Sequence, residues 1–190
     1  MISGVEIKRK IVHLATLSIP IGYALLPKEK VITILLPLFF GFLVVDLLRH
    51  YHHGVASLFQ RYLLGTVLRE EERDTLMGST YFLFSSLLVI LFFTRPIAIT
   101  SLLILILSDT AAALAGKGIG RIRIFKKTLE GSLAFLVSSL IIVWAYPELN
   151  RFWGSLAALG ATLVELLPVR VDDNLTIPLV AGVIMFFGMG

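Results

Sequence analysis

The chain has 190 residues, of which 57% are hydrophobic, and its mean hydropathy is +0.90. A soluble domain of this length needs apolar residues only for its core, so the composition excludes an ordinary soluble protein and indicates one integral membrane domain over residues 1–190. The net charge of +4 does not indicate nucleic-acid binding, and the absence of cysteine excludes disulfides and thiolate metal sites.

Apolar runs of about 16–20 residues recur along the chain, which is the length that a helix needs to cross a hydrocarbon layer. The first run has no small-residue cleavage pattern after it, so it is not expected to be a removable signal peptide. The sequence therefore predicts an all-α, polytopic transmembrane bundle. Its seven expected spans are residues 10–26, 31–48, 79–94, 96–115, 131–147, 152–168 and 174–190.

The basic residues predict the orientation of these spans. With the N-terminus in the cytosol, only four of the 17 Lys and Arg residues fall outside: Lys28, Lys30, Arg95 and Arg151. The excess of positive charge on the other side favours a cytosolic N-terminus and an external C-terminus. The two long connections, 49–78 and 116–130, are then cytosolic, and we expect working residues there because function gathers on loops held by a rigid scaffold.

The connection 49–78 carries apolar residues at helical spacing. Val55, Leu58, Phe59 and Tyr62 are part of this pattern, which predicts a helix lying in the membrane interface. A helix packed on the bundle is an equally open alternative. The histidines of the sequence "HYHH" (50–53) are not favoured as a metal site, because adjacent side chains point in different directions.

Three carboxylates lie within predicted spans, where an ionisable group is expensive and suggests function: Asp46, Asp109 and Glu165. From their distance in sequence to the span ends, they lie roughly 5–12 Å from the cytosolic side, and His13 is at a similar depth. We therefore expect these side chains to meet in one layer. The alternative is an isolated helix–helix hydrogen bond for each; it is favoured for His13 and stays open for Asp46.

The residues after Asp109 predict an anion site. Glycines let backbone N–H groups approach an anion, lysines and arginines neutralise phosphate, and the start of the span at residue 131 adds helix N-terminal amides. No Walker A or protein-kinase motif is present. Asp172 and Asp173 precede the last span; helix capping explains one of them but not both. Carboxylates beside a basic loop indicate a Mg²⁺–nucleotide site.

These blocks resemble a known family. "SDTAAALAGKGIGR" (108–121) followed by "FKKTLEGS" (125–132) is similar to the signature shared by phosphatidate cytidylyltransferases and CTP-dependent lipid kinases. "VDDNLTIPL" (171–179) resembles the kinase branch, which includes dolichol kinase, phytol kinase and CTP-dependent diacylglycerol kinase. "RKIVHL" (9–14) and "LREEERDTLMGSTYFL" (68–83) resemble the short phytol-kinase-type members. The later cytidylyltransferase motif, an Asp-Arg pair followed by Asp-Ser, is absent.

The resemblance implies roles for individual residues. Asp109, Asp172 and Asp173 would hold the divalent metal and the nucleotide. Apart from the resemblance, a carboxylate within a span, Asp46 or Glu165, is the candidate acceptor of the proton from the lipid hydroxyl. Glu130 and Thr128 would complete the loop, with Asn174 and Thr176 shaping the same pocket. The nucleotide-binding residues would include Gly116, Lys117, Gly120, Arg121, Lys126 and Lys127.

The predicted function is a multi-pass, membrane-embedded kinase. It would transfer the γ-phosphate of Mg-CTP to the hydroxyl of a lipid alcohol at the cytosolic face, with a polyprenol such as dolichol, a phytol-like alcohol or diacylglycerol as acceptor. A CTP-lipid cytidylyltransferase, which releases pyrophosphate, is the nearest alternative. A transporter is disfavoured because no repeat is visible and the charges gather on one side. Nucleic acid is not an expected partner, and homo-oligomerisation is left open.

Overall fold

The computed structural model describes residues 4–51, 75–168 and 171–189, and it is all-α apart from one short hairpin. The helix predicted within 49–78, its apolar pattern and two of the "HYHH" histidines lie outside the described residues. The elements are α1 (Gly4–Ala15), α2 (Ser18–Leu25), α3 (Lys28–Tyr51), α5 (Gly78–Phe92), α6 (Arg95–Leu103), the π-helical turn η3 (Ile104–Ser108), α7 (Asp109–Gly118), β1 (Arg123–Ile124), β2 (Lys127–Thr128), α8 (Leu129–Trp144), α9 (Arg151–Leu166), α10 (Asp173–Phe186) and the 3₁₀ turn η4 (Phe187–Met189).

Two stretches, Lys28–Arg49 and Arg95–Gly118, are helical, long enough and apolar enough to cross a membrane, judged by length and composition. Three shorter apolar helices accompany them: Gly78–Phe92, Leu129–Trp144 and Asp173–Phe186. All seven predicted spans are therefore helical within the described residues. That each of them crosses a membrane stays a prediction.

The first predicted span, 10–26, is two helices instead of one. Pro20 has no N–H, and its ring conflicts with the carbonyl of Thr16 one turn earlier. The chain tightens there: Leu17 N–H donates to Leu14 O at 3.0 Å, and Ile19 N–H donates to Thr16 O at 3.0 Å. α1 and α2 consequently meet at a break around residues 16–17.

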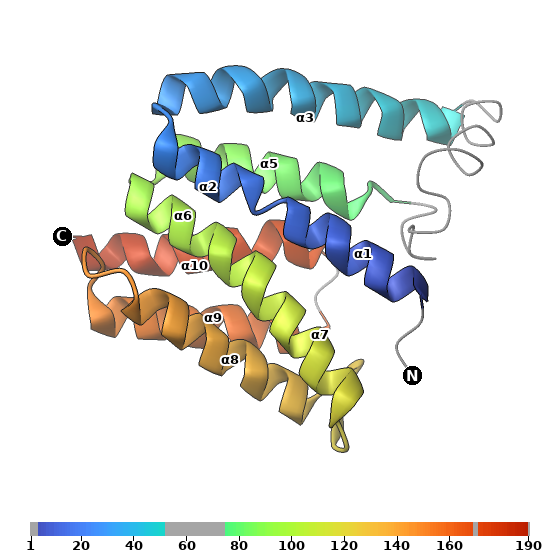
Figure 1. Ribbon diagram of the computed structural model, residues 1–190, viewed down its shortest axis with the longest axis vertical. Coiled ribbons are helices and arrows are strands. Elements are labelled where there is room, and N and C mark those ends of the chain that lie inside the picture. Colours follow the sequence, from blue (N-terminus) through green and yellow to red (C-terminus); the bar gives the residue numbers. More distant parts are fainter. Residues whose placement is uncertain (1–3, 52–74, 169–170, 190) are drawn as a thin grey trace.

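The helices lie side by side with alternating directions (Figure 1). The N-terminus, the starts of α5, α8 and α10, and the ends of α3, α7 and α9 gather at one end, which we call the N-terminal end of the bundle. The C-terminus and the short turns after α2, α5 and α8 lie at the other end. This alternation is the one that the predicted topology requires.

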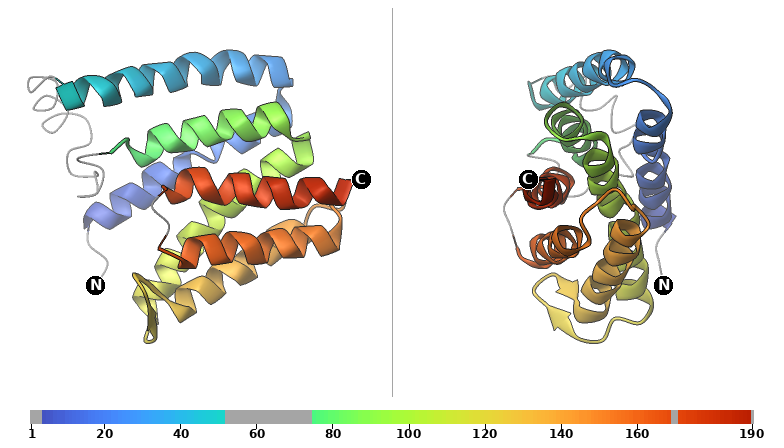
Figure 2. Two further views of the ribbon diagram at one scale, coloured as in Figure 1. Left: turned by 180° about the vertical axis from the view of Figure 1, so that it is seen from behind. Right: turned by 90° about the vertical axis from the view of Figure 1, so that its left-hand side faces the viewer.

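The stretch α6–η3–α7 runs obliquely through the bundle and forms its centre (Figure 1). It contacts α2, α5, α8 and α10 along its length. Ile97, Leu102, Ile104 and Ile106 on it are fully buried, so protein surrounds its middle part, whereas Leu114 on α7 is 53% exposed. In contrast, α3 lies at one edge of the bundle and the β1–β2 hairpin at the opposite edge (Figure 2).

Two cations that the topology places outside have structural partners at the C-terminal end of the bundle. Lys28 Nζ donates to Leu91 O at 2.8 Å, and Arg95 Nη2 donates to Leu26 O at 3.1 Å. Leu91 and Leu26 lie where α5 and α2 end, and a positive charge there complements the exposed carbonyls of the last helical turn.

Candidate functional site

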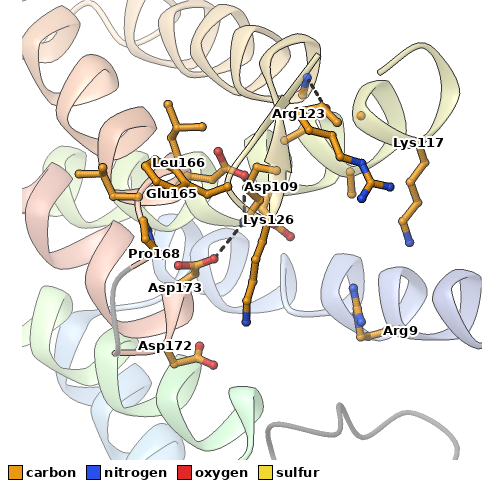
Figure 3. Close-up of a pocket in the computed structure, with 18 of the residues that line it drawn as sticks. Arg9, Asp109, Lys117, Arg123, Lys126, Glu165, Leu166, Pro168, Asp172 and Asp173 are labelled. Atoms are coloured by element: carbon orange, nitrogen blue, oxygen red, sulfur yellow. Dashed lines mark hydrogen bonds and ion pairs between the residues drawn. The ribbon is translucent and has the colours of Figure 1, made fainter. Parts of the chain in front are cut away.

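A cavity of about 950 Å³ lies at the N-terminal end of the bundle (Figure 3). Its walls come from α1, α5, α7, the hairpin, the start of α8, the end of α9, and the described residues 167–168 and 171–173. Six of the described lining residues are cationic and four are carboxylates. The cations are Arg9, Lys10, Lys117, Arg123, Lys126 and Lys127, and the carboxylates are Asp109, Glu165, Asp172 and Asp173. The excess of positive charge suits a polyanionic ligand.

Asp109 begins α7, directly after the π-helical turn η3. A π turn adds one residue to the helix, and one residue rotates the following face by about 100°. Lys10 Nζ on α1 lies 2.5 Å from Asp109 Oδ2 and donates to Asp109 O at 3.2 Å. His13 Nε2 lies 3.6 Å from the same carboxylate oxygen. The cost of placing a carboxylate among apolar helices is thus offset by a cation from the first helix.

Lys127 joins three elements at the cavity wall. Its Nζ lies 2.9 Å from Glu165 Oε1 on α9 and 3.2 Å from Asp173 Oδ2 on α10. The second oxygen of Glu165 accepts a hydrogen bond from Ser132 Oγ at 3.0 Å. Burial acts to lower the pKa of Lys127, but the carboxylates of Asp173 and Glu165 outweigh it and raise this pKa above its usual range. Lys127 therefore stays charged, and its contacts with Glu165 and Asp173 hold α9 and α10 against the hairpin.

Three glycines of the quoted blocks pack around one threonine. A Cβ on Gly116 would lie 2.8 Å from Thr128 Oγ1, and one on Gly131 would lie 2.9 Å from the same atom. A Cβ on Gly120 would overlap the carbonyl oxygen of Gly116. Thr128 caps α8 by accepting from Gly131 N–H at 3.2 Å. These glycines let the end of α7 lie directly against the start of α8, in addition to any contact with an anion.

Replacing Gly120 by alanine is expected to lower the free energy of unfolding by about 1–3 kcal/mol, because backbone must move to admit the methyl group. Gly118→Ala is the matched control, since nothing lies within 4 Å of its Cβ position. Thermal unfolding of both variants in one detergent, followed by circular dichroism, measures the difference. Equal midpoints for the two variants would show that the close approach at Gly120 contributes nothing to stability.

Asp172 and Asp173 have separate roles in the structure. Asp172 caps α10: its Oδ1 accepts from Asn174 N–H and from Asn174 Nδ2, each at 2.8 Å. Its backbone carbonyl accepts from Thr176 Oγ1 at 3.2 Å. Asp173 instead points to Lys127. Capping therefore accounts for one member of the pair, and both members line the cavity.

Asp46 does not line the cavity. It is fully buried, and its carboxylate accepts from Arg49 Nε, Met77 N–H and Thr80 Oγ1, each at 2.7 Å. Arg49 Nη2 also donates to Thr75 O at 2.6 Å. This network fastens the end of α3 to the start of α5. The predicted single layer of carboxylates is therefore divided into two places in the structure.

Glu130 also lies outside the cavity lining. Its Oε1 accepts from Arg121 N–H at 2.9 Å and from Ile122 N–H at 3.3 Å, which holds the turn before β1. Hydrogen bonds from its own backbone N–H and from that of Arg121 keep the pKa of Glu130 below its usual range. Gly120, Arg121, Asn174 and Thr176 are likewise absent from the lining, whereas Gly116, Lys117, Lys126, Lys127 and Thr128 belong to it.

Comparison with known proteins gives clear relatives. An uncharacterised protein of Rickettsia prowazekii is 32% identical over 183 residues, covering 92% of this chain and 90% of that protein. A probable chloroplastic phytol kinase of Triticum aestivum is 31% identical over 159 residues, covering 73% of this chain and 53% of its own length. CTP-dependent diacylglycerol kinase 1 of Schizosaccharomyces pombe is 29% identical over 209 residues, covering 97% and 94%.

The chain belongs to the family of the phytol kinases and the CTP-dependent diacylglycerol kinases. The resemblance seen in the sequence blocks is thereby confirmed. The chain spans about half the length of the wheat relative and nearly all of the fission-yeast one. No protein-family model matches it. No solved structure matches it either.

Residue-by-residue reasoning missed several residues that line the cavity. Arg9, Lys10, Thr75 and Tyr81 line it. All four lie in the two blocks, 9–14 and 68–83, that resemble phytol-kinase-type members, so those blocks were the available signal. Arg123, one of the arginines after Asp109 that were expected to neutralise phosphate, also lines the cavity.

The carboxylates of the cavity are the candidate ligands for a metal ion. Among the described residues, no group of three or more His, Asp or Glu side chains is arranged to hold a metal ion. Asp109 and Asp173 nevertheless line one cavity with six cations around it. Mg²⁺ is commonly bound by one or two carboxylates together with substrate phosphates, and this pair fits that pattern.

Proposed function

We propose that this protein is a kinase that transfers the γ-phosphate of CTP to the hydroxyl of a membrane lipid alcohol. One observation carries the proposal: a single cavity joins cations from α1, α7 and the hairpin with carboxylates from α7, α9 and α10. Catalysis of phosphoryl transfer consists mainly of positioning and of neutralising phosphate charge, and these residues supply both. The names of the diacylglycerol kinases among its relatives support CTP as the donor.

The proposed roles follow from the positions in the cavity. Arg9, Lys117, Arg123 and Lys126 bind the triphosphate, and Lys127 positions Glu165 and Asp173. Asp109 and Asp173 would hold Mg²⁺ together with the phosphates, and the metal would neutralise charge on the phosphate oxygens. Lys10, which contacts Asp109, lines the same cavity and would lie beside the phosphates.

Glu165 is the proposed proton acceptor in the chemical step. Two candidates were predicted, Asp46 and Glu165, and Glu165 is the one that lines the cavity. The alcohol oxygen forms a bond to the γ-phosphorus while the bond from that phosphorus to the β–γ bridging oxygen breaks. CDP leaves, and the hydroxyl proton passes to the carboxylate of Glu165. Asp46 has a structural role in this proposal.

We propose that the chain is an integral membrane protein whose cavity lies at the cytosolic face of the membrane. The positive-inside bias supports this orientation, since the cations of the cavity lie at the N-terminal end of the bundle. A cytosolic nucleotide and a membrane alcohol can meet at that end.

The test uses purified full-length protein in lipid micelles with CTP labelled at the γ-phosphate, Mg²⁺ and a panel of alcohols: phytol, dioleoylglycerol and a polyprenol. Label in a lipid phosphate is the expected result, and ATP labelled in the same way is the control for the base. Label found in pyrophosphate, with CDP-lipid formed, would replace the kinase proposal by the cytidylyltransferase. Absence of labelled products with every alcohol would reject both.

A further inference from the structure

The two walls of the cavity differ in chemistry, and Figure 3 shows this directly. Lys117, Arg123 and Arg9 lie on one side. Leu166 and Pro168, from the end of α9 and the segment after it, lie on the other side with Glu165. A triphosphate belongs on the cationic side, so the acceptor must approach from the apolar side if the two are to react in line.

The cavity meets the protein surface on the cationic side, where Arg123 and Lys126 are exposed, and it also does so at the apolar wall. Leu167 and Val171 both line the cavity, yet they are 48% and 44% exposed. Side chains that border a cavity and remain half exposed form a passage between the interior and the outside. An apolar passage beside carboxylates suits an amphiphile that carries one hydroxyl.

The passage continues along α9. Leu156, Leu159 and Leu163 lie at i, i+3 and i+7 and therefore share one face of the helix, and they are 40%, 47% and 57% exposed. Leu167 follows Leu163 at the next i+4 position. From Leu156 to Leu167 this apolar stripe, which we call the α9 stripe, is roughly 16 Å long.

Another exposed apolar stripe does not have this continuity. On α8, Leu133, Val137 and Ile141 are 51%, 55% and 65% exposed. Leu133 does not line the cavity, and the start of α8 is preceded by Lys126 and Lys127. The α8 stripe therefore faces the surroundings without leading into the site.

We propose that the hydrocarbon tail of the acceptor alcohol leaves the cavity over Leu167 and Val171 and lies along the α9 stripe, with its hydroxyl inside beside the carboxylates. This inference rests on the proposed kinase activity and adds the path that selects a long apolar tail. The occupant is the acceptor itself, because the stripe is continuous with the apolar wall of the catalytic cavity.

The kinetic test compares Leu163→Ala and Leu167→Ala with Leu133→Ala, which replaces an exposed leucine of α8 that does not line the cavity. For phytol, each α9-stripe variant is expected to raise KM about tenfold, since apolar contact with the tail is lost. For Leu163→Ala, the KM for CTP and the kcat/KM for a short-chain acceptor, 1-hexanol, should stay unchanged. The control variant should match the wild type with both alcohols. Equal KM values for phytol in all variants would overturn the path.

A second measurement does not require turnover. Hexadecanol carrying a diazirine halfway along its chain is photolysed with the full-length protein, and the labelled peptides are mapped. Label concentrated on residues 156–167 is expected; label spread equally over the α8 and α9 stripes would show bulk lipid contact only and overturn the inference. The two proposals fail differently: a wild type inactive with all alcohols rejects the kinase, while an active wild type with evenly spread label rejects the path alone.

Discussion

Asp109→Asn is expected to abolish phosphoryl transfer while the protein remains folded. The substitution removes a negative charge that we assign to the Mg-nucleotide but keeps an oxygen that can accept from Lys10, whose Nζ lies 2.5 Å from the carboxylate. Asp109 would hold the metal that neutralises the transferring phosphoryl group, and losing that neutralisation costs on the order of 10³-fold or more in rate. The measurement is the initial rate of lipid phosphate formation at saturating CTP.

The control for this variant is Glu148→Gln, which makes the same carboxylate-to-amide change at an exposed position near the opposite end of the bundle. It should retain wild-type activity. Circular dichroism and gel filtration of Asp109→Asn establish that it is folded. A folded Asp109→Asn protein with activity near that of the wild type would remove Asp109 from the site, and with it the proposed metal position.

Asp46→Ala is expected to have the largest effect on stability. Asp46 is fully buried and accepts three hydrogen bonds, among them one from Arg49 Nε at 2.7 Å. Deleting one partner of a buried ion pair typically costs 3–5 kcal/mol, because it leaves the other charge without compensation. The loss is measured as the change in unfolding free energy of the detergent-solubilised protein, with thermal midpoints as a check.

A double-mutant cycle separates the ion pair from the other contacts of Asp46. Arg49→Met alone and the double variant Asp46→Ala/Arg49→Met complete the cycle. We expect the double variant to be less destabilised than the sum of the two single variants. If Asp46→Ala were as stable as the wild type but inactive, the earlier expectation of Asp46 as the proton acceptor would be restored and Glu165 displaced.

The helices could be predicted from hydropathy because the apolar runs are long and separated by charged turns. The exception was the first span, where Pro20 divides the helix in two. Pro20 could have indicated this break, because proline disrupts a helix interior. The prediction instead followed the apolar run Ile11–Leu26, which suggested one continuous helix. The π turn η3 before Asp109 had no comparable signal, since its residues, Ile104–Ser108, suit an ordinary helix equally well.

The blocks that resemble the family contain most of the cavity, yet they also contain residues that do not reach it. Glu130 holds the turn at Arg121 and Ile122, and Asn174 takes part in the cap of α10. A sequence block contains residues that the local structure needs as well as residues that line the cavity. The sequence alone does not distinguish these two kinds of residue.

The sequence by itself determined that the apolar runs are helical, the alternating directions of these helices, the end of the bundle that carries the cations, and the family. Only the tertiary structure decided which carboxylates meet. Hydropathy locates the ends of a span, and the distance in sequence to those ends gives the depth of a residue. Asp46, Asp109 and Glu165 have similar depths. The direction of a side chain around its helix depends on packing and, for Asp109, on the preceding π turn. Residues of similar depth therefore lie in different places. Asp109 and Glu165 line the cavity with Asp173, whereas Asp46 belongs to the network that joins α3 to α5.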